Sequence, residues 1–365
     1  MAAACGPGPS SGARSGKNAL PKPITQPDSE TQAVEDGVID ALGRRLSFRE
    51  PPRRIVLPGR AVFIIADAIY MFPEAGKRIA ATGRSDQGAS KFFSLIDPDT
   101  GARRILAELS GAEQIAEVRP DVVFLKSYLA PTLGNPLEAL GIPVVYVDFE
   151  TPDQYFRDLQ TLGRVLGQRM RAAELIAYYR GLMERVRSGL EGLKEDQKRR
   201  ALLLQYSEKG GMVAFRVPPG SWMQTQMTVL AGGIPVWKQA NPGRGWATVA
   251  LEQILAWDPD DIFMISYTKN SAEVVDALRS HPIWNQLSAM KAGKVHAFAG
   301  DLYSWDQPSP RWILGLLWMA RQLYPDRFVQ VDIPAVTEDF YRAAYGLDSE
   351  FFRTKIRSTF QGDLR

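Results

Sequence analysis

Short apolar runs bounded by polar residues recur along the chain and indicate alternating helices and strands. Two of these runs, at 122–125 and 262–265, are continuously apolar, as expected for strands that helices cover on both faces. Each run follows a helical Glu-Gln-Ile pattern and a Pro-Asp pair, and a residue before proline is disfavoured in a helix. The pattern therefore predicts, twice, a short helix, a break and a buried strand.

The two patterns belong to one internal repeat. Residues 113–128 and 252–267 share eight of sixteen residues, including Glu-Gln-Ile near the start and Ser-Tyr at the end. Such self-similarity predicts two related α/β lobes. Ligands of open α/β sheets bind beyond the carboxyl ends of the strands, which makes Ser127-Tyr128 and Ser266-Tyr267 candidate contacts. The alternative is chance similarity on a common theme, with both tyrosines merely capping a sheet.

The remaining pattern predicts an α/β fold of two lobes, with a helical segment at 151–198 that is long enough to bridge them. The joining segment opens with Thr151 as a cap and Pro152 at the first helical position, and a break near Gly167 divides its helical spacing. The predicted segments are a disordered leader (1–45), an N-terminal lobe (46–150), the linking helix (151–198), a C-terminal lobe (199–325) and a helical tail (326–365).

Composition narrows the class of protein. The chain has 365 residues, 45% of them hydrophobic, with 44 basic and 41 acidic residues and a net charge of +3. This balance argues against a nucleic-acid partner. The single cysteine, Cys5, follows three alanines and precedes a flexible Gly-Pro-Ser stretch, which is typical of the lipidation site of a bacterial lipoprotein. The charged and apolar parts of a signal peptide do not precede it, so either the start is truncated or the match is accidental.

Catalytic and metal-binding motifs are missing from the sequence. It contains two histidines, His281 and His296, and neither belongs to a His-Glu-x-x-His or similar ligand motif. There is also no Gly-x-Ser-x-Gly elbow, no Walker loop and no Gly-x-Gly-x-x-Gly turn. The sequence thus predicts a protein that is not an enzyme, with no catalytic residues, no metal ligands of its own and no resident cofactor.

The predicted loops carry aromatic and basic side chains instead. Aromatic faces offer rigid contact area and arginine pairs with anionic oxygens, so these loops suit a large, partly apolar, negatively charged ligand. About half of the aromatic residues are expected to be ordinary packing rather than ligand contacts. The candidates are Phe215, Arg216, Trp222, Arg244, Trp246, Tyr303 and Trp305.

In this order, the motifs of residues 50–325 resemble those of the helical-hinge (class III) periplasmic substrate-binding proteins of ABC importers for iron-siderophores, haem and cobalamin. Besides the repeat and the linking helix, the resemblance rests on Arg54-Ile-Val, Gly141-Ile-Pro-Val, Ala231-Gly-Gly, His281-Pro-Ile-Trp, Ala292-Gly-Lys-Val and Trp305-Asp-Gln-Pro-Ser-Pro-Arg311.

The resemblance implies two Rossmann-like α/β lobes joined by a single long rigid helix, with the ligand in the cleft between the lobes. It also implies roles for particular residues. One exposed glutamate on each lobe of such proteins docks on an arginine pocket of the membrane subunits, and the matching residues are Glu113 and Glu252. The alternative is that both are first-turn acids favoured by the helix dipole. The resemblance adds Arg84, Ser127 and Tyr128 to the candidate ligand contacts. A haem ligand would need an axial tyrosine or methionine such as Met223, which ranks haem below a fully coordinated chelate.

The resemblance thus predicts a monomeric, periplasmic or lipid-tethered receptor on the outer face of the cell membrane. It would capture a metal chelate, first of all a ferric siderophore, and deliver it to a permease dimer powered by an ATPase. Cobalamin and haem are the alternatives of the same transporter type. A sensor or cofactor-scaffold protein with the same cleft is the alternative from another class, since fold does not fix function.

Overall fold

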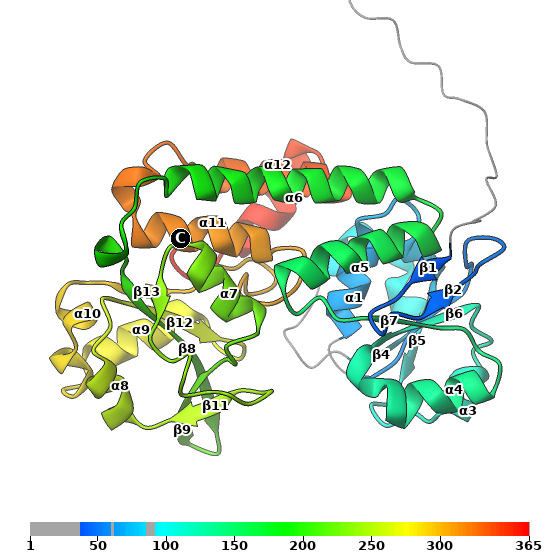
Figure 1. Cartoon of the computed structure of the whole chain (residues 1–365), viewed down its shortest axis with the longest axis horizontal. Helices are drawn as coiled ribbons and strands as arrows, with labels where there is room; N and C mark the ends of the chain where they lie inside the picture. Colours follow the sequence, from blue (N-terminus) through cyan, green and yellow to red (C-terminus); the bar gives the residue numbers. More distant parts are fainter. Residues whose placement is uncertain (1–36, 60–61, 85–91, 365) are drawn as a thin grey trace, which may run out of the picture. The chain divides into compact units, whose positions relative to one another are not determined.

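The computed structural model describes residues 37–59, 62–84 and 92–364. Two sheets dominate the described residues, and helices flank both (Figure 1). We call the part built on the sheet of β3 to β7 the N-terminal lobe, and the part built on the sheet of β8 to β13 the C-terminal lobe. The predicted α/β class is confirmed.

The N-terminal sheet is parallel throughout, in the order β5-β4-β3-β6-β7. In three of its five strands, β3, β6 and β7, every residue is buried, as expected of a parallel sheet covered on both faces. The strand predicted at 122–125 is present as β6. The bounds are β3 Ile55–Leu57, β4 Ile79–Gly83, β5 Arg104–Leu106, β6 Val122–Lys126 and β7 Val144–Val147.

The C-terminal sheet is mixed, in the order β11-β9-β8-β12-β13, with β10 paired to β8. Strands β8, β12 and β13 run parallel, whereas β8, β9 and β11 are antiparallel. The second predicted strand is present as β12. The bounds are β8 Arg200–Lys209, β9 Met212–Val217, β10 Ile234–Pro235, β11 Ala247–Val249, β12 Asp261–Ser266 and β13 Val295–Ala297.

Helices α3 and α8 carry the two copies of the repeat and precede β6 and β12. The helix bounds are α1 Val62–Tyr70, α2 Phe92–Ile96, α3 Ala112–Ala116, α4 Asn135–Ala139, α5 Pro152–Val165, α6 Arg169–Gly189, α7 Met223–Leu230, α8 Leu251–Trp257, α9 Ser271–Arg279, α10 Ser288–Lys291, α11 Trp312–Leu323, α12 Ile333–Tyr345 and α13 Ser349–Phe351.

The linking segment consists of two helices, α5 and α6, rather than one continuous helix. Thr151 caps α5 by accepting from the Gln154 backbone N–H, and Gly167 separates the helices with a φ of +73°. The chain therefore breaks at the glycine that the sequence pattern singled out. Helix α6 packs on α5, α11 and α12, and so joins the two lobes (Figure 1).

Folded structure starts before the predicted end of the leader at residue 45. Strands β1 (Val38–Ile39) and β2 (Arg45–Leu46) form a hairpin. The hairpin is anchored because the Ala41 backbone N–H donates to the Tyr146 carbonyl oxygen of β7 at 2.9 Å. The proposed lipidation site, Cys5, lies outside the described residues.

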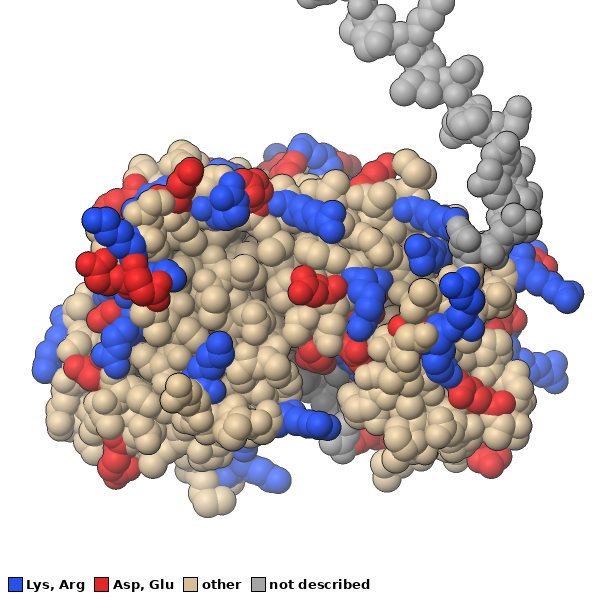
Figure 2. Space-filling model, viewed as in Figure 1, with Lys and Arg blue, Asp and Glu red and all other residues tan. Residues whose placement is uncertain are grey.

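Basic and acidic side chains are scattered over the face of the molecule that Figure 2 presents and do not form large patches of one sign. This agrees with the balanced composition. Among the described residues, no helix combines the length and the apolar character that crossing a membrane requires.

Candidate ligand site

A polar cavity of about 260 Å³ lies beyond the carboxyl end of β12. Ser266 ends that strand, and Tyr267 and Thr268 follow it into the cavity wall. The opposite wall comes from the loop before α11, through Tyr303, Ser304 and Gln307. Hydroxyl and amide groups thus line the cavity where the sheet topology places a ligand.

Asp306 holds side chains of the cavity wall in place through hydrogen bonds. Its carboxylate is fully buried and accepts from Tyr267 Oη at 2.7 Å, Gln224 Nε2 at 3.2 Å and Ser304 Oγ at 2.5 Å. These donors are all neutral, so burial raises the pKa of Asp306, and it raises the pKa of Tyr267 as well. Gln307 contributes a buried Oε1 atom with no hydrogen-bond partner among the described residues. Gln307 lines the cavity, although this oxygen atom is itself buried.

An aromatic strip runs from the cavity along the C-terminal lobe. Trp222 and Trp246 meet edge to face with ring centroids 5.7 Å apart, and Trp246 meets Tyr267 at 6.3 Å. Trp222 and Trp246 are only partly buried, and Arg244 is exposed two residues before Trp246. The structure thus brings two predicted site residues together beside Tyr267: Trp246 contacts Tyr267, and Trp222 contacts Trp246.

Ser127 and Tyr128 stand at the corresponding edge of the N-terminal lobe, directly after β6. The Tyr128 side chain is 63% exposed, which is unusual for a large aromatic residue that has only a structural role. Arg84 is also exposed and follows β4 in the same sheet. All three predicted residues are therefore accessible at the carboxyl ends of parallel strands.

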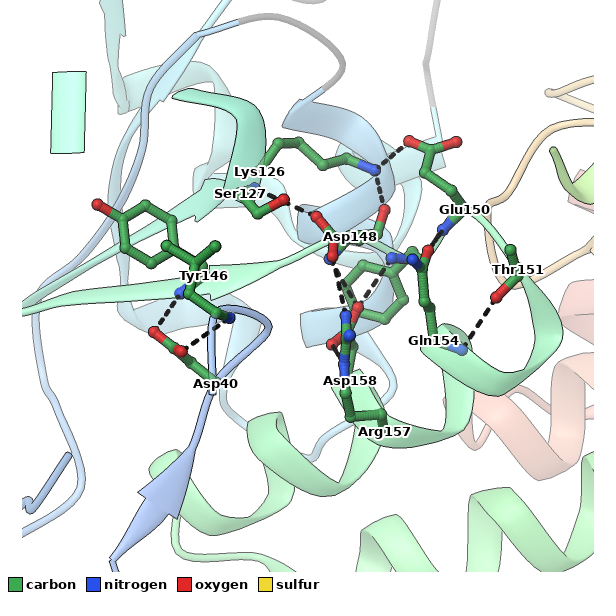
Figure 3. Close-up of polar contacts among 12 residues, drawn as sticks. Asp40, Lys126, Ser127, Tyr146, Asp148, Glu150, Thr151, Gln154, Arg157 and Asp158 are labelled. Carbon is green, nitrogen blue, oxygen red and sulfur yellow. Dashed lines mark hydrogen bonds and ion pairs between the residues drawn. The ribbon is translucent and has the colours of Figure 1, made fainter. Parts of the chain in front are cut away.

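A polar network fixes the backbone beneath Ser127 (Figure 3). The Asp148 carboxylate accepts from the Ser127 backbone N–H at 3.2 Å and from Arg157 Nη2 at 3.0 Å. The buried ammonium of Lys126 donates to the Asp148 carbonyl oxygen and, at 2.7 Å, to Glu150. These contacts tie the end of β6 to the end of β7, so the loop that carries Tyr128 starts from a fixed point.

Asp158 extends the network into α5. Its Oδ2 atom accepts from the backbone N–H groups of Asp148 at 2.6 Å and Phe149 at 2.8 Å, while Oδ1 pairs with Arg157 (Figure 3). Burial raises the pKa of Asp158 even though these partners favour its charged form. Phe149 has a φ of +60°, a conformation that such a residue rarely adopts without support. The two hydrogen bonds that Asp158 accepts, from Phe149 and from the preceding residue, supply that support.

The other predicted contacts lie elsewhere. Phe215 packs on Trp284, with ring centroids 4.9 Å apart, and lines a different cavity. Arg216, the next residue of β9, points to the opposite face of the sheet because strand side chains alternate, and it lies beside Gln205 in the ladder. Phe215 and Arg216 therefore do not act together at one surface.

Tyr303 and Trp305 are buried. Tyr303 is 3% exposed, yet it lines the polar cavity and stacks on Phe63 of α1 at 5.2 Å. Trp305 has no exposed surface, and its indole N–H donates to Asp301 at 3.1 Å. Trp305 is thus a core residue in this structure, whereas Tyr303 stays at the site. Met223, considered as a haem ligand, is also fully buried.

Glu113 and Glu252 occupy equivalent positions, each the second residue of its helix, α3 or α8. Both side chains are exposed. Neither histidine stands at the polar cavity: His296 Nε2 lies 2.9 Å from Asp261 in the core, and His281 lines the same cavity as Phe215. Within the described ranges, no group of three or more His, Cys, Asp or Glu residues is placed to hold a metal ion.

Sequence reasoning missed Asp306, Gln307 and Gln224. Asp306 and Gln307 lie inside the Trp305–Arg311 motif, but nothing in that motif shows that Asp306 faces Tyr267 from 39 residues away. Gln224 has no sequence signal at all. Only the packing of α7 against the loop before α11 reveals it as a partner of Asp306.

This architecture, two α/β lobes joined by helices with polar edges at the strand ends, is typical of ligand-binding proteins. The family model described as "Periplasmic binding protein" matches residues 107–301. The chain belongs to this family. The predicted relationship with periplasmic substrate-binding proteins of ABC importers, which are transport components, is confirmed.

The descriptions of individual relatives name different ligands. The molybdate-binding protein MolA of Haemophilus influenzae is 24% identical over 339 residues, covering 86% of this chain and 92% of MolA. A periplasmic solute-binding protein from Veillonella parvula is 22% identical with a TM-score of 0.70, covering 88% of this chain and 97% of that one. Helicobacter pylori CeuE with Ni(II) bound is 18% identical with a TM-score of 0.67, covering 88% and 100%. The two solved structures establish the fold.

Proposed function

We propose that this protein is the receptor of an ABC importer for a negatively charged metal chelate, with a ferric siderophore as the first candidate. The observation that carries the proposal is the aromatic strip of Trp222, Trp246 and Tyr267 beside the polar cavity. Aromatic faces bind the flat or apolar parts of a bulky ligand, while the hydroxyl and amide groups of the cavity bind its oxygen atoms. Exposed Arg84 and Arg244 supply positive charge.

Coordination of the metal is assigned to the chelator. His296 is engaged with Asp261 in the core, and His281 belongs to the other cavity. Met223 is buried in α7, which gives no support to haem with that axial ligand. Cobalamin remains the closest competitor, because the aromatic strip suits a corrin ring as well as a siderophore.

A small oxyanion is the second candidate, favoured by the likeness to MolA and by the modest size of the polar cavity. The charged groups in the wall of the polar cavity argue against a small oxyanion. The described cation in the cavity wall is Lys269, and its ammonium already donates to Glu208 at 2.6 Å. A divalent oxyanion needs charge-assisted donors, whereas a bulky chelate with spread charge can rely on hydroxyl groups and aromatic faces.

The proposal includes delivery. Glu113 and Glu252 are assigned to docking on the two membrane subunits, since a pseudo-symmetric pair of carboxylates fits a symmetric dimer. The protein works as a monomer in the periplasm or on the outer face of the membrane, and lipidation of Cys5 would tether it there.

The ligand is tested by native mass spectrometry and absorbance titration of the purified protein against ferric siderophores, haemin, cobalamin and molybdate. We expect a stoichiometric coloured adduct with a ferric siderophore. The affinity of a Trp246→Leu variant should be lower by about fivefold or more, because aromatic stacking contributes about 1 kcal/mol or more. Trp257→Leu, which removes a tryptophan at the end of α8, is the control and should bind normally. Tight molybdate binding that Trp246→Leu leaves unchanged would establish the oxyanion instead.

A further inference from the structure

A second cavity of about 730 Å³ opens in the C-terminal lobe, between α9 and strands β9 and β11. Its walls are mainly aromatic and aliphatic, and Lys269, Glu273 and His281 also line it. Phe215 and Val249, which are paired neighbours on β9 and β11, form one side, and Val274 and Leu278 of α9 form the other. Trp284 also lines the cavity and packs on Phe215, with ring centroids 4.9 Å apart. The volume is that of sites for small organic ligands.

The cavity exists because the sheet extends beyond the helix that covers it. Helix α9 packs on β12 and β13, whereas β9 and β11 form the other end of the sheet (Figure 1). Val213, two residues before Phe215 and on the same face of β9, is 51% exposed. Each Å² of apolar surface left in water costs about 25 cal/mol, so an open apolar pocket of this size points to a ligand.

Lys269 lies between this apolar cavity and the polar cavity, because it lines both of them. Its ammonium donates to Glu208 and lies 5.9 Å from the ring centroid of Tyr206, which also lines the apolar cavity. The first turn of α9 is divided in the same way: Ser271 lines the polar cavity, and Val274 lines the apolar one. The two cavities are thus neighbours around one short segment.

We propose that the apolar cavity is a second subsite for the transported ligand, and that this ligand is an amphiphilic chelate bearing an acyl chain or aryl group. This rests on the proposed function. The polar, metal-bearing part occupies the cavity at Tyr267, and the apolar group passes Lys269 to lie between Phe215 and Val274. The subsite also explains why Phe215, expected at the ligand from the sequence, lies apart from the polar cavity.

The experiment measures the affinity of a series of ferric trihydroxamates that carry acetyl, hexanoyl or decanoyl groups, by tryptophan fluorescence. Each buried methylene contributes about 0.8 kcal/mol, so affinity should rise by up to about fourfold per methylene. Ala277→Trp fills the cavity from an exposed position of α9, where the substitution leaves the core intact. We expect it to abolish the dependence on chain length without weakening the acetyl complex. Asp276→Trp, on the same helix but outside the cavity, is the control.

Equal affinity across the series in the wild type, or a chain-length dependence that survives Ala277→Trp, would overturn the subsite. The same holds if Ala277→Trp abolishes capture by the membrane subunits and leaves the series unchanged, since the cavity would then be a docking groove beside Leu251 and Glu252. Decanoic acid below its micelle concentration separates the two proposals. If no ferric complex binds, but decanoic acid binds the wild type and not Ala277→Trp, the chelate function fails and the apolar subsite stands. If decanoic acid does not bind either, the subsite fails too.

Discussion

Arg311 and Asp67, 244 residues apart in the chain, form an ion pair of 2.5 Å in which neither side chain has any exposed surface. Asp67 belongs to α1 of the N-terminal lobe, and Arg311 immediately precedes α11 beside the C-terminal lobe. The Arg311 guanidinium also pairs with Asp301 at 3.0 Å. A single buried cation therefore connects the two lobes.

Aromatic rings enclose this cation. The guanidinium carbon lies 4.5 Å from the ring centroid of Phe92, 4.9 Å from that of Tyr303 and 5.3 Å from that of Tyr341. Tyr341 belongs to α12, so the C-terminal tail takes part in the joint between the lobes. Tyr303 also lines the polar cavity, which places the joint directly behind the candidate ligand site.

Arg311→Met should destabilise the protein strongly. It leaves Asp67 and Asp301 buried without a cation, and removing one partner of a buried ion pair costs about 3–5 kcal/mol. The free energy of unfolding from urea titration measures the effect. Arg342→Met, which breaks an exposed pair with Asp339, is the control and should change the stability by about 1 kcal/mol or less. Similar losses in the two variants would show that Arg311 holds nothing together.

The same joint predicts little closure on ligand binding. Arg171 of α6 reinforces it by donating to the carbonyl oxygens of Met71 at 3.0 Å and Ala343 at 2.7 Å, at the ends of α1 and α12. Opening or closing the lobes would have to break these part-buried hydrogen bonds and the buried pair of Arg311 with Asp67. Small-angle scattering should therefore give nearly the same radius of gyration with and without ligand, and a large compaction would contradict a rigid joint.

Asp306→Asn should change how stability depends on pH. Burial raises the pKa of Asp306 in the folded state above the value of about 3.9 expected in the unfolded chain. Protonation of Asp306 therefore stabilises the folded protein fully below about pH 3.9. This contribution to the free energy of unfolding is lost as the pH rises through the folded-state pKa of Asp306. The variant cannot titrate there, so its stability relative to the wild type should increase with pH through this window. Urea titrations at several pH values measure this, and Asp276→Asn, on the surface, is the control. Parallel curves would rule out a raised pKa.

Only glycine fits without strain at position 315 of α11. A Cβ atom there would lie 2.4 Å from the Trp305 carbonyl oxygen, in the loop that carries Asp306. Gly315→Ala should therefore cost about 1–3 kcal/mol, because backbone has to move in a packed core. Gly181 of α6 has open space around it, and Gly181→Ala should stabilise the helix by about 0.5–1 kcal/mol. Thermal unfolding of the matched pair should give shifts of opposite sign.

The sequence was informative where chemistry repeats locally. The Glu-Gln-Ile, Pro-Asp and apolar patterns predicted α3 with β6 and α8 with β12, because helix propensity, proline and strand burial all act within a few residues. Gly167 marked the division of the linking segment for the same reason. Thr151 and Pro152 likewise marked the start of α5.

Side-chain environments set by distant contacts could not be predicted in this way. Trp305 was expected at the ligand because its loop is rich in Gly, Pro and aromatic residues, yet its indole binds Asp301 in the core. The loop is buried because Arg311 meets Asp67, and no pattern in the sequence announces a pair that far apart. Phe215 was separated from Arg216 by strand alternation, which the sequence alone left unassigned because β9 had not been predicted.

Glu113→Ala combined with Glu252→Ala should abolish capture of the protein by detergent-solubilised membrane subunits. Both carboxylates are exposed in the first turn of matching helices, so their removal leaves the fold and the ligand affinity unchanged while it deletes both charge contacts. Pull-down and ligand titration of the same samples measure the two properties. Glu117→Ala with Asp276→Ala removes two exposed acids from α3's end and from α9, and should dock normally. Docking that survives the first pair of substitutions would leave Glu113 and Glu252 as helix-dipole acids and nothing more.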